Sequence, residues 1–193
     1  MMGGMKGAMS GALVYVMGPS GSGKDSLLRA LREGLADGDP VLVAHRYITR
    51  PSDASEASVA LTPAEFSRRS ELGCFALQWR SHGLHYGVGI EIDAWMARGL
   101  TVVVNGSREH LGAAHARYPG LHAVQVQVRH EVLATRLAAR GRESGEAVAA
   151  RLARATQPFD LPPGCRLTRL DNSGPLEQAA DALLRLVRAP IAA

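Results

Sequence analysis

Residues 18–26 read Gly-Pro-Ser-Gly-Ser-Gly-Lys-Asp-Ser and follow directly on an apolar run, Ala-Leu-Val-Tyr-Val-Met at 12–17. They match the pattern G-x-x-x-x-G-K-[ST] of a phosphate-binding loop except at Asp25, where the pattern has a hydroxyl that reaches Mg²⁺. In such a loop the glycines let the backbone wrap around phosphate oxygens, the next helix offers unpaired N–H groups, and the lysine adds a positive charge. We therefore expect a nucleotide to be bound through Gly18, Pro19, Ser20, Gly21, Ser22, Gly23, Lys24, Asp25 and Ser26.

The flanks of this segment distinguish a binding loop from a flexible linker, which is the ordinary interpretation of a glycine-rich run. The apolar run before it predicts a buried strand. After it, residues 25–33 place Leu27, Leu28 and Leu31 on one face of a helix. A phosphate-binding loop requires this order of strand, loop and helix, so we favour nucleotide binding over a linker.

Length and composition indicate one domain. The chain has 193 residues, of which 46% are hydrophobic, and no internal stretch reads as a linker between two cores. We expect a flexible tail at 1–10 and a single domain over 11–193. The net charge of +4 could indicate a nucleic-acid partner, but the arginines are dispersed and only 5% of residues are aromatic. Small anionic molecules are therefore the expected partners, and no nucleic acid.

Cysteine usage and hydropathy bear on the compartment. Cys74 and Cys165 form neither a CxxC nor a zinc-type pattern, which predicts two reduced thiols and no disulfide. No stretch approaches the roughly 18 apolar residues of a membrane span, and the first residues do not read as a signal peptide. We expect a soluble, cytoplasmic protein with no membrane contact.

Strands and helices alternate along most of the chain. The patterns predict further strands at 41–45, 74–79, 100–104, 123–128 and 166–170, and helices at 91–98, 108–118, 131–139, 146–156 and 176–187. Thr62 begins a capping box, and residues 47–58 read as a loop. This alternation predicts an α/β fold, a parallel sheet flanked by helices, with a small mixed insertion at about 45–90. The phosphate-binding loop then lies at the carboxyl edge of the sheet, where such sheets bind ligands.

Arginines flank a glycine-rich break between the two helices predicted at 131–139 and 146–156. Two solvated amphipathic helices would explain them. Beside a phosphate-binding loop, however, they fit a lid at about 136–155 that closes over the nucleotide and stabilises the charge of a transferring phosphoryl group. The expected catalytic residues are Lys24, Arg136, Arg140 and Arg151.

Several blocks in the right order resemble the guanylate kinase-like P-loop kinases over residues 11–187. They read GPSGSGKDSLL at 18–28, VAHRYITR at 43–50, ALTPAEF at 60–66, GLHYGVGIEID at 83–93, VVVNGSREHL at 102–111, RLAARGRE at 136–143 and ARLARA at 150–155. Within this group the ribose 1,5-bisphosphate phosphokinases are the most similar. The resemblance implies ATP and Mg²⁺ as cofactors, a sugar bisphosphate as acceptor, and formation of 5-phosphoribosyl 1-diphosphate in phosphonate catabolism. It leaves the oligomeric state open, a homodimer included.

The resemblance also implies where the acceptor binds. The expected substrate-binding residues are His45, Arg50, Glu56, Tyr86, Asn105, Ser107 and Arg108. Guanylate kinases have a second phosphate-binding arginine where this chain has Asp53, and a guanine-reading carboxylate about where Leu77 stands. A leucine cannot accept hydrogen bonds from a guanine edge, so GMP is expected to be a poor acceptor. His82 and His85 are interpreted as surface histidines, since no third metal ligand is evident.

Two further departures concern the metal. Guanylate kinases carry an aspartate where this chain has Asn105, whereas Asp25 supplies a carboxylate that their loop lacks. We hypothesise that the changes are linked and that Asp25, with Ser26, holds or orients Mg²⁺ directly or through water. The alternative is that Asp25 only stabilises the N-terminus of the helix.

Two other functions stay open at this point: a nucleoside monophosphate kinase, and a non-catalytic guanylate kinase-like module that binds a partner peptide. Gly23 and Lys24 are intact and the lid keeps its arginines, for which a pure binding module has no physical need. The sequence therefore favours a kinase.

Overall fold

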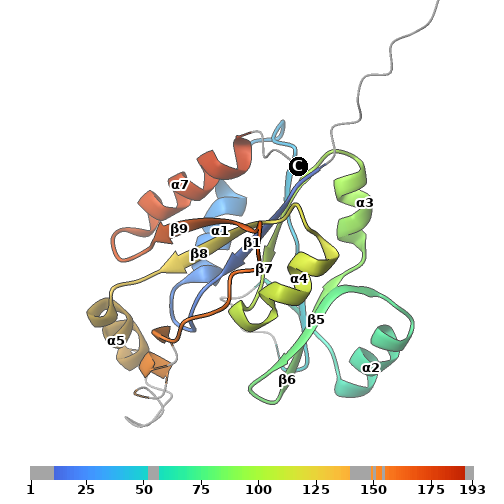
Figure 1. The fold of residues 1–193 in the computed structure, drawn as a ribbon, viewed down its shortest axis with the longest axis horizontal. Coiled ribbons are helices and arrows are strands. Elements are labelled where there is room, and N and C mark those ends of the chain that lie inside the picture. The colour runs from blue at the N-terminus through green and yellow to red at the C-terminus, as the bar shows by residue number, and fades with distance from the viewer. Residues whose placement is uncertain (1–10, 52–56, 140–148, 150, 154, 190–193) are drawn as a thin grey trace, which may run out of the picture.

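The computed structural model describes residues 11–51, 57–139, 149, 151–153 and 155–189. In these residues a parallel five-stranded sheet has the order β2-β7-β1-β8-β9 (Figure 1). Its strands are β1 (Leu13–Met17), β2 (Val41–Val43), β7 (Thr101–Asn105), β8 (His122–Gln127) and β9 (Arg166–Asp171). Every residue of β1 is buried, as expected for the central strand of a parallel sheet that is covered on both faces. The predicted α/β class is confirmed.

Alternate residues of β1 belong to two different cores. Val14 and Val16 pack with the helices α1 (Lys24–Gly34) and α7 (Leu176–Arg188) on one face of the sheet. On the other face Tyr15 packs in the core that receives Ile92 of α3 (Glu91–Ala97) and Leu111 of α4 (Leu111–Arg117). The two helical layers enclose the sheet and leave its carboxyl edge for the loops (Figure 1).

A second sheet has four strands in the order β4-β3-β6-β5 and adjoins α2 (Pro63–Glu71). Its strands are β3 (Arg46–Ile48), β4 (Ser58–Ala60), β5 (Phe75–Ser81) and β6 (Leu84–Gly89). The loop predicted over residues 47–58 is therefore wrong at both ends, because residues 47–48 belong to β3 and Ser58 belongs to β4. Three-residue strands carry no readable alternation, and the antiparallel pairing with β6 and the parallel pairing with β4 decide that β3 is a strand.

The two predicted helices of the lid are described in part. Helix α5 spans His130–Ala139, and residues 149, 151–153 and 155 are helical. Arg140, Glu56 and the predicted tail at 1–10 lie outside the described residues. A short 3₁₀ helix, η1 (Arg108–His110), precedes α4.

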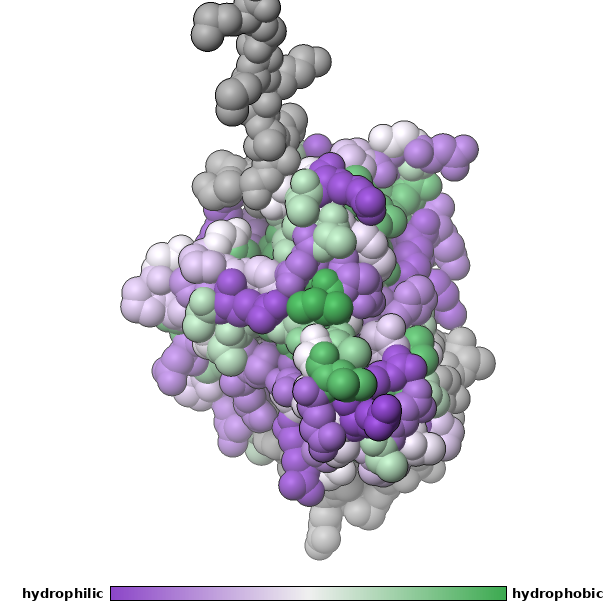
Figure 2. Space-filling view, turned by 90° about the vertical axis from the view of Figure 1, so that its right-hand side faces the viewer, coloured by the Kyte–Doolittle hydropathy of each residue, from purple (hydrophilic) through white to green (hydrophobic). Residues whose placement is uncertain are grey.

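The surface mixes polar and apolar residues. Figure 2 shows hydrophobic residues in small patches between hydrophilic ones, as is usual on folded proteins. Among the described residues, no helix has the length and apolar character that a membrane span needs.

Candidate active site

The loop from Gly18 to Gly23 leaves the carboxyl end of β1 and leads into α1. Gly21 and Gly23 have φ angles of 87° and 85°, which side chains rarely allow. A Cβ at Gly23 would also lie 2.6 Å from Nδ2 of Asn172. The Lys24 ammonium donates to the carbonyls of Gly18 and Pro19, at 2.8 and 2.9 Å. It therefore lies over the loop in which it is expected to bind phosphate.

Asn172 ties this loop to the sheet, and the sequence did not single it out. Asn172 is buried, with 2% of its surface exposed, and its Nδ2 donates to the Ser22 carbonyl at 2.8 Å. Its backbone N–H donates to the Gln127 carbonyl at the end of β8, also at 2.8 Å. The only available signal was a polar residue directly after a strand, at the edge where α/β sheets bind ligands.

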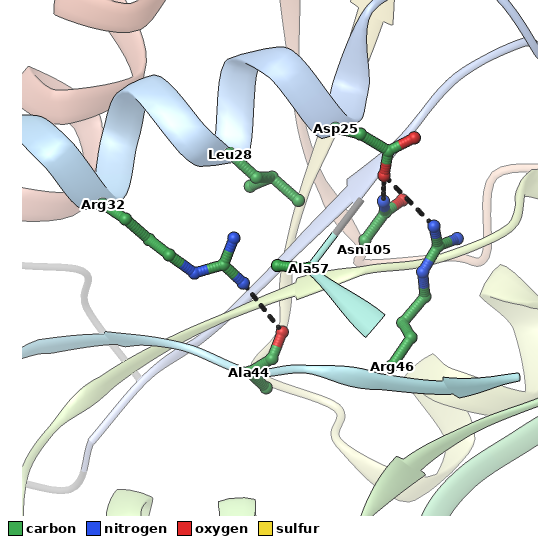
Figure 3. Close-up of a pocket in the computed structure, with 7 residues that line it drawn as sticks. All are labelled: Asp25, Leu28, Arg32, Ala44, Arg46, Ala57 and Asn105. Atoms are coloured by element: carbon green, nitrogen blue, oxygen red, sulfur yellow. Dashed lines mark hydrogen bonds and ion pairs between the residues drawn. The ribbon is translucent and has the colours of Figure 1, made fainter. Parts of the chain in front are cut away.

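Asp25 and Asn105 meet at the start of α1 (Figure 3). Nδ2 of Asn105 donates to Oδ1 of Asp25 at 2.8 Å, and the same oxygen accepts from the guanidinium of Arg46 at 3.1 Å. The second carboxylate oxygen of Asp25 points away from both partners, and the side chain is 41% exposed. Oδ1 of Asn105 is buried and has no hydrogen-bond partner among the described residues. The structure thus joins the two positions that the sequence linked by hypothesis, and adds Arg46.

The donor atoms at this point are oxygens, which hard cations such as Mg²⁺ prefer. Asp25 offers its second carboxylate oxygen, which points away from Asn105 and Arg46. The described residues contain no group of three or more His, Cys, Asp or Glu that could hold a metal by itself. Mg²⁺ is ordinarily held by one or two carboxylates together with substrate phosphates and water, so these residues fit it.

A column of stacked side chains runs from η1 to the second sheet. The ring of His110 lies 5.4 Å from Trp79 on β5, Trp79 lies 5.5 Å from Tyr86 on β6, and the guanidinium of Arg46 lies 5.8 Å from the Tyr86 ring centre. Burial lowers the pKa of His110. Through Arg46 the column ends at Asp25, so it connects the second sheet with the phosphate-binding loop.

Tyr15 supports the turn that follows β7. Its hydroxyl donates to the Ser107 carbonyl and accepts from the Ser107 N–H, both at 2.9 Å, and burial raises its pKa. A Cβ at Gly106 would collide with the Tyr15 ring. Arg108, expected to face the substrate, donates to the carbonyls of Ala155 and Gln157 at 3.1 and 3.2 Å. These contacts hold the segment at residues 155–157, where the chain leaves the predicted lid. The segment is distant from Arg108 in the sequence, so no local pattern could indicate the contact.

The lid arginines within the described residues lie at the loop. Arg151 donates to the Ser20 hydroxyl at 3.0 Å, and NH1 of Arg136 lies 3.7 Å from the position of a Cβ on Gly23. On the acceptor side, His45 is exposed and Arg50 is half-buried. Leu77 is 3% exposed within the core, so it does not line an open site.

Comparison with known proteins identifies relatives of this chain. No protein-family model matches it. A curated ribose 1,5-bisphosphate phosphokinase PhnN from Achromobacter xylosoxidans is 59% identical over 181 residues, 94% of each chain. Another of the same name from Thiobacillus denitrificans is 55% identical over 179 residues, 92% of this chain and 93% of its own. A guanylate kinase structure from Anaplasma phagocytophilum superposes with a TM-score of 0.68 at 16% identity, over 96% of this chain and 88% of that one, which shows a common fold.

Proposed function

Because the chain belongs to the ribose 1,5-bisphosphate phosphokinase family, we propose that it transfers the γ-phosphoryl group of ATP to the 1-phosphate of ribose 1,5-bisphosphate. The bond between the γ-phosphorus and the β–γ bridging oxygen breaks, and an oxygen of the 1-phosphate forms the new bond. The products are ADP and 5-phosphoribosyl 1-diphosphate. The observation that supports the proposal most directly is the contact of Asp25 with Asn105 and Arg46 at the start of α1, beside the phosphate-binding loop.

On the donor side, Lys24 binds the β- and γ-phosphates of ATP, and the loop N–H groups surround them. Asp25 and Ser26 hold Mg²⁺, which neutralises phosphate charge when it is bound. Arg136 and Arg151, together with Arg140, stabilise the charge of the transferring group. The contact of Arg151 with Ser20 supports this role, since it already brings one lid arginine to the loop.

On the acceptor side, no general base is required. The second pKa of a phosphate monoester is about 6, by analogy with phosphorylated side chains, so the 1-phosphate is a nucleophile at neutral pH. Catalysis then consists of positioning and charge neutralisation. Arg50 and Tyr86 bind an acceptor phosphate, with His45 and Glu56 nearby in sequence, and Asn105 and Ser107 face the sugar. Arg108 faces the sugar or its other phosphate, and it also donates to the carbonyls of Ala155 and Gln157 at the exit of the lid.

GMP is not favoured as the acceptor, because the buried Leu77 leaves no carboxylate at that position to read guanine. We also propose a cytoplasmic location. Cys74 and Cys165 are both free in the structure, which suits a reducing compartment.

The test offers purified protein ATP and Mg²⁺ with ribose 1,5-bisphosphate or GMP, and identifies the product by mass. We expect phosphorylation of the ribose compound, and loss of that activity in Lys24→Met. Turnover of GMP alone would overturn the proposal, and no turnover with tight binding of a peptide partner would favour the non-catalytic module.

The metal role of Asp25 has its own test. Asp25→Ser should lower activity in a way that excess Mg²⁺ partly restores. An Mg²⁺ dependence equal to that of the unmodified protein would contradict this role and leave the reaction itself untouched.

A further inference from the structure

Arg46 occupies the junction between the two sheets and has no role so far. Its side chain is only 13% exposed, although it projects from a three-residue strand at the edge of a cavity. One side of the guanidinium contacts Asp25 of α1, and the other lies over the ring of Tyr86. Figure 3 shows the contact with Asp25, and Tyr86 lies beyond the residues drawn there; the core and the second sheet thus hold Arg46 together.

The cavity beside Arg46 is small, about 10 Å³, and further polar groups line it. Asp25, Arg32 and Asn105 line it, with Ala44 and Ala57 as small apolar neighbours. Asn105 is 4% exposed, and its Oδ1 lacks a hydrogen-bond donor among the described residues. Leaving a buried acceptor without a donor is unfavourable, so this atom indicates a ligand that donates, such as a sugar hydroxyl.

A guanidinium is chemically suited to the anionic part of such a ligand. It is planar, remains charged, and presents donors in a fork that matches two phosphate oxygens. Phosphoryl transfer between two phosphates also needs positive charge between the donor and the acceptor, since both groups are anions. Arg46 lies next to Asp25, the residue that follows Lys24, and is therefore beside the expected position of the γ-phosphate.

We propose that Arg46 binds the 1-phosphate of the acceptor and that Asp25 positions Arg46 through their 3.1 Å ion pair. The inference rests on the proposed function, and it adds the residue that recognises the attacking phosphate. Tyr86 then acts through its ring face, which fixes the plane of the guanidinium.

The first experiment measures binding without ATP or metal. Isothermal titration compares ribose 1,5-bisphosphate with ribose 5-phosphate, which lacks the 1-phosphate. We expect the unmodified protein to bind the bisphosphate at least about tenfold more tightly, as one charge-assisted hydrogen bond allows. Arg46→Gln should reduce this preference to about twofold or less, and an unchanged preference would overturn the inference.

Arg69→Gln is the matched control. Arg69 also lies over a tyrosine ring, 5.3 Å from the centre of Tyr47, and pairs with a carboxylate, Glu65, at 2.6 Å. It is on α2 and does not line the cavity. In kinetics, Arg46→Gln should raise KM for the bisphosphate at least about tenfold and leave KM for ATP within about twofold, whereas Arg69→Gln should change neither.

A double-mutant cycle tests the positioning by Asp25. If Asp25 acts through Arg46, Asp25→Asn should weaken acceptor binding in the unmodified protein but cause no further loss in a protein that already carries Arg46→Gln. Effects that simply multiply would refute the positioning role. If Arg46→Gln does not fold, as judged by circular dichroism, Arg46→Lys serves in its place, because it keeps the charge without the fork and should still weaken acceptor binding.

Failure of the inference differs from failure of the proposed function. A protein that phosphorylates ribose 1,5-bisphosphate with equal KM in Arg46→Gln and in its unmodified form contradicts the inference alone. A protein that phosphorylates none of the ribose compound contradicts the proposed function.

Discussion

Replacing Asn172 with alanine should destabilise the protein and weaken ATP binding together. The side chain is buried and donates to the Ser22 carbonyl inside the phosphate-binding loop at 2.8 Å. Truncation leaves that carbonyl without its donor, which costs about 1–3 kcal/mol for a buried group. It also removes Oδ1 of Asn172, a buried acceptor that has no partner among the described residues. The second effect offsets part of the first, so we expect a loss of about 1–2 kcal/mol in the free energy of unfolding.

Asn172→Ala should also weaken ATP binding, by a free energy similar to the loss in stability. Without Asn172 the Ser22 carbonyl is no longer fixed, and ATP must order the loop when it binds. A penalty of about 1–2 kcal/mol weakens binding roughly 5- to 30-fold.

Urea denaturation followed by circular dichroism measures the stability, and isothermal titration with Mg²⁺ and ATP measures the affinity. Ser173→Ala is the control, since Ser173 is the next residue and its hydroxyl contacts Asp171 and the Arg129 N–H, outside the loop. An Asn172→Ala protein that is folded and binds ATP as tightly as the unmodified protein would refute the reasoning.

Three other substitutions or conditions test the packing around the site. Gly106→Ala should lower activity, because its Cβ would collide with the Tyr15 ring that supports the turn after β7, and a variant with unchanged kcat would contradict this. Leu77→Glu should lower the free energy of unfolding by about 3 kcal/mol or more without creating GMP activity, because it buries a carboxylate in the core; denaturation and the GMP assay check both points. Burial lowers the pKa of His110 and of His122, so the unfolded chain binds protons at a higher pH than the folded protein does. The free energy of unfolding should therefore fall as the pH drops below about 6.5, by at most about 1.4 kcal/mol per pH unit for each histidine. Denaturation at pH 7 and 5.5 measures this loss, and His110→Phe, which keeps a ring on Trp79, should reduce it; an equal loss in the variant would exclude His110 as a contributor.

The second sheet shows where prediction from sequence stops. The longer strands of the central sheet were found from their apolar runs, and β5 was found from the run at 74–79. In contrast, the predicted loop at 47–58 covered most of β3 and the first residue of β4, because each of these strands has three residues and too few positions to display a period of two. Their partners on neighbouring strands supply the hydrogen bonds that make them strands.

The sequence by itself determined the phosphate-binding loop, the α/β class and the family resemblance. These depend on consecutive residues: glycines that allow positive φ, a lysine at a set spacing, and apolar periods that bury a strand or a helix face. Only the tertiary structure decided which polar residues meet at that loop. Asn105 reaches Asp25 across 80 residues because β7 lies beside β1, and Asn172 reaches Ser22 across 150 residues because it follows β9 at the same edge of the sheet. Arg46 joins them because its strand pairs with β6, which brings its guanidinium over Tyr86 and against Asp25. Such contacts depend on the order of strands in a sheet, which local patterns do not specify.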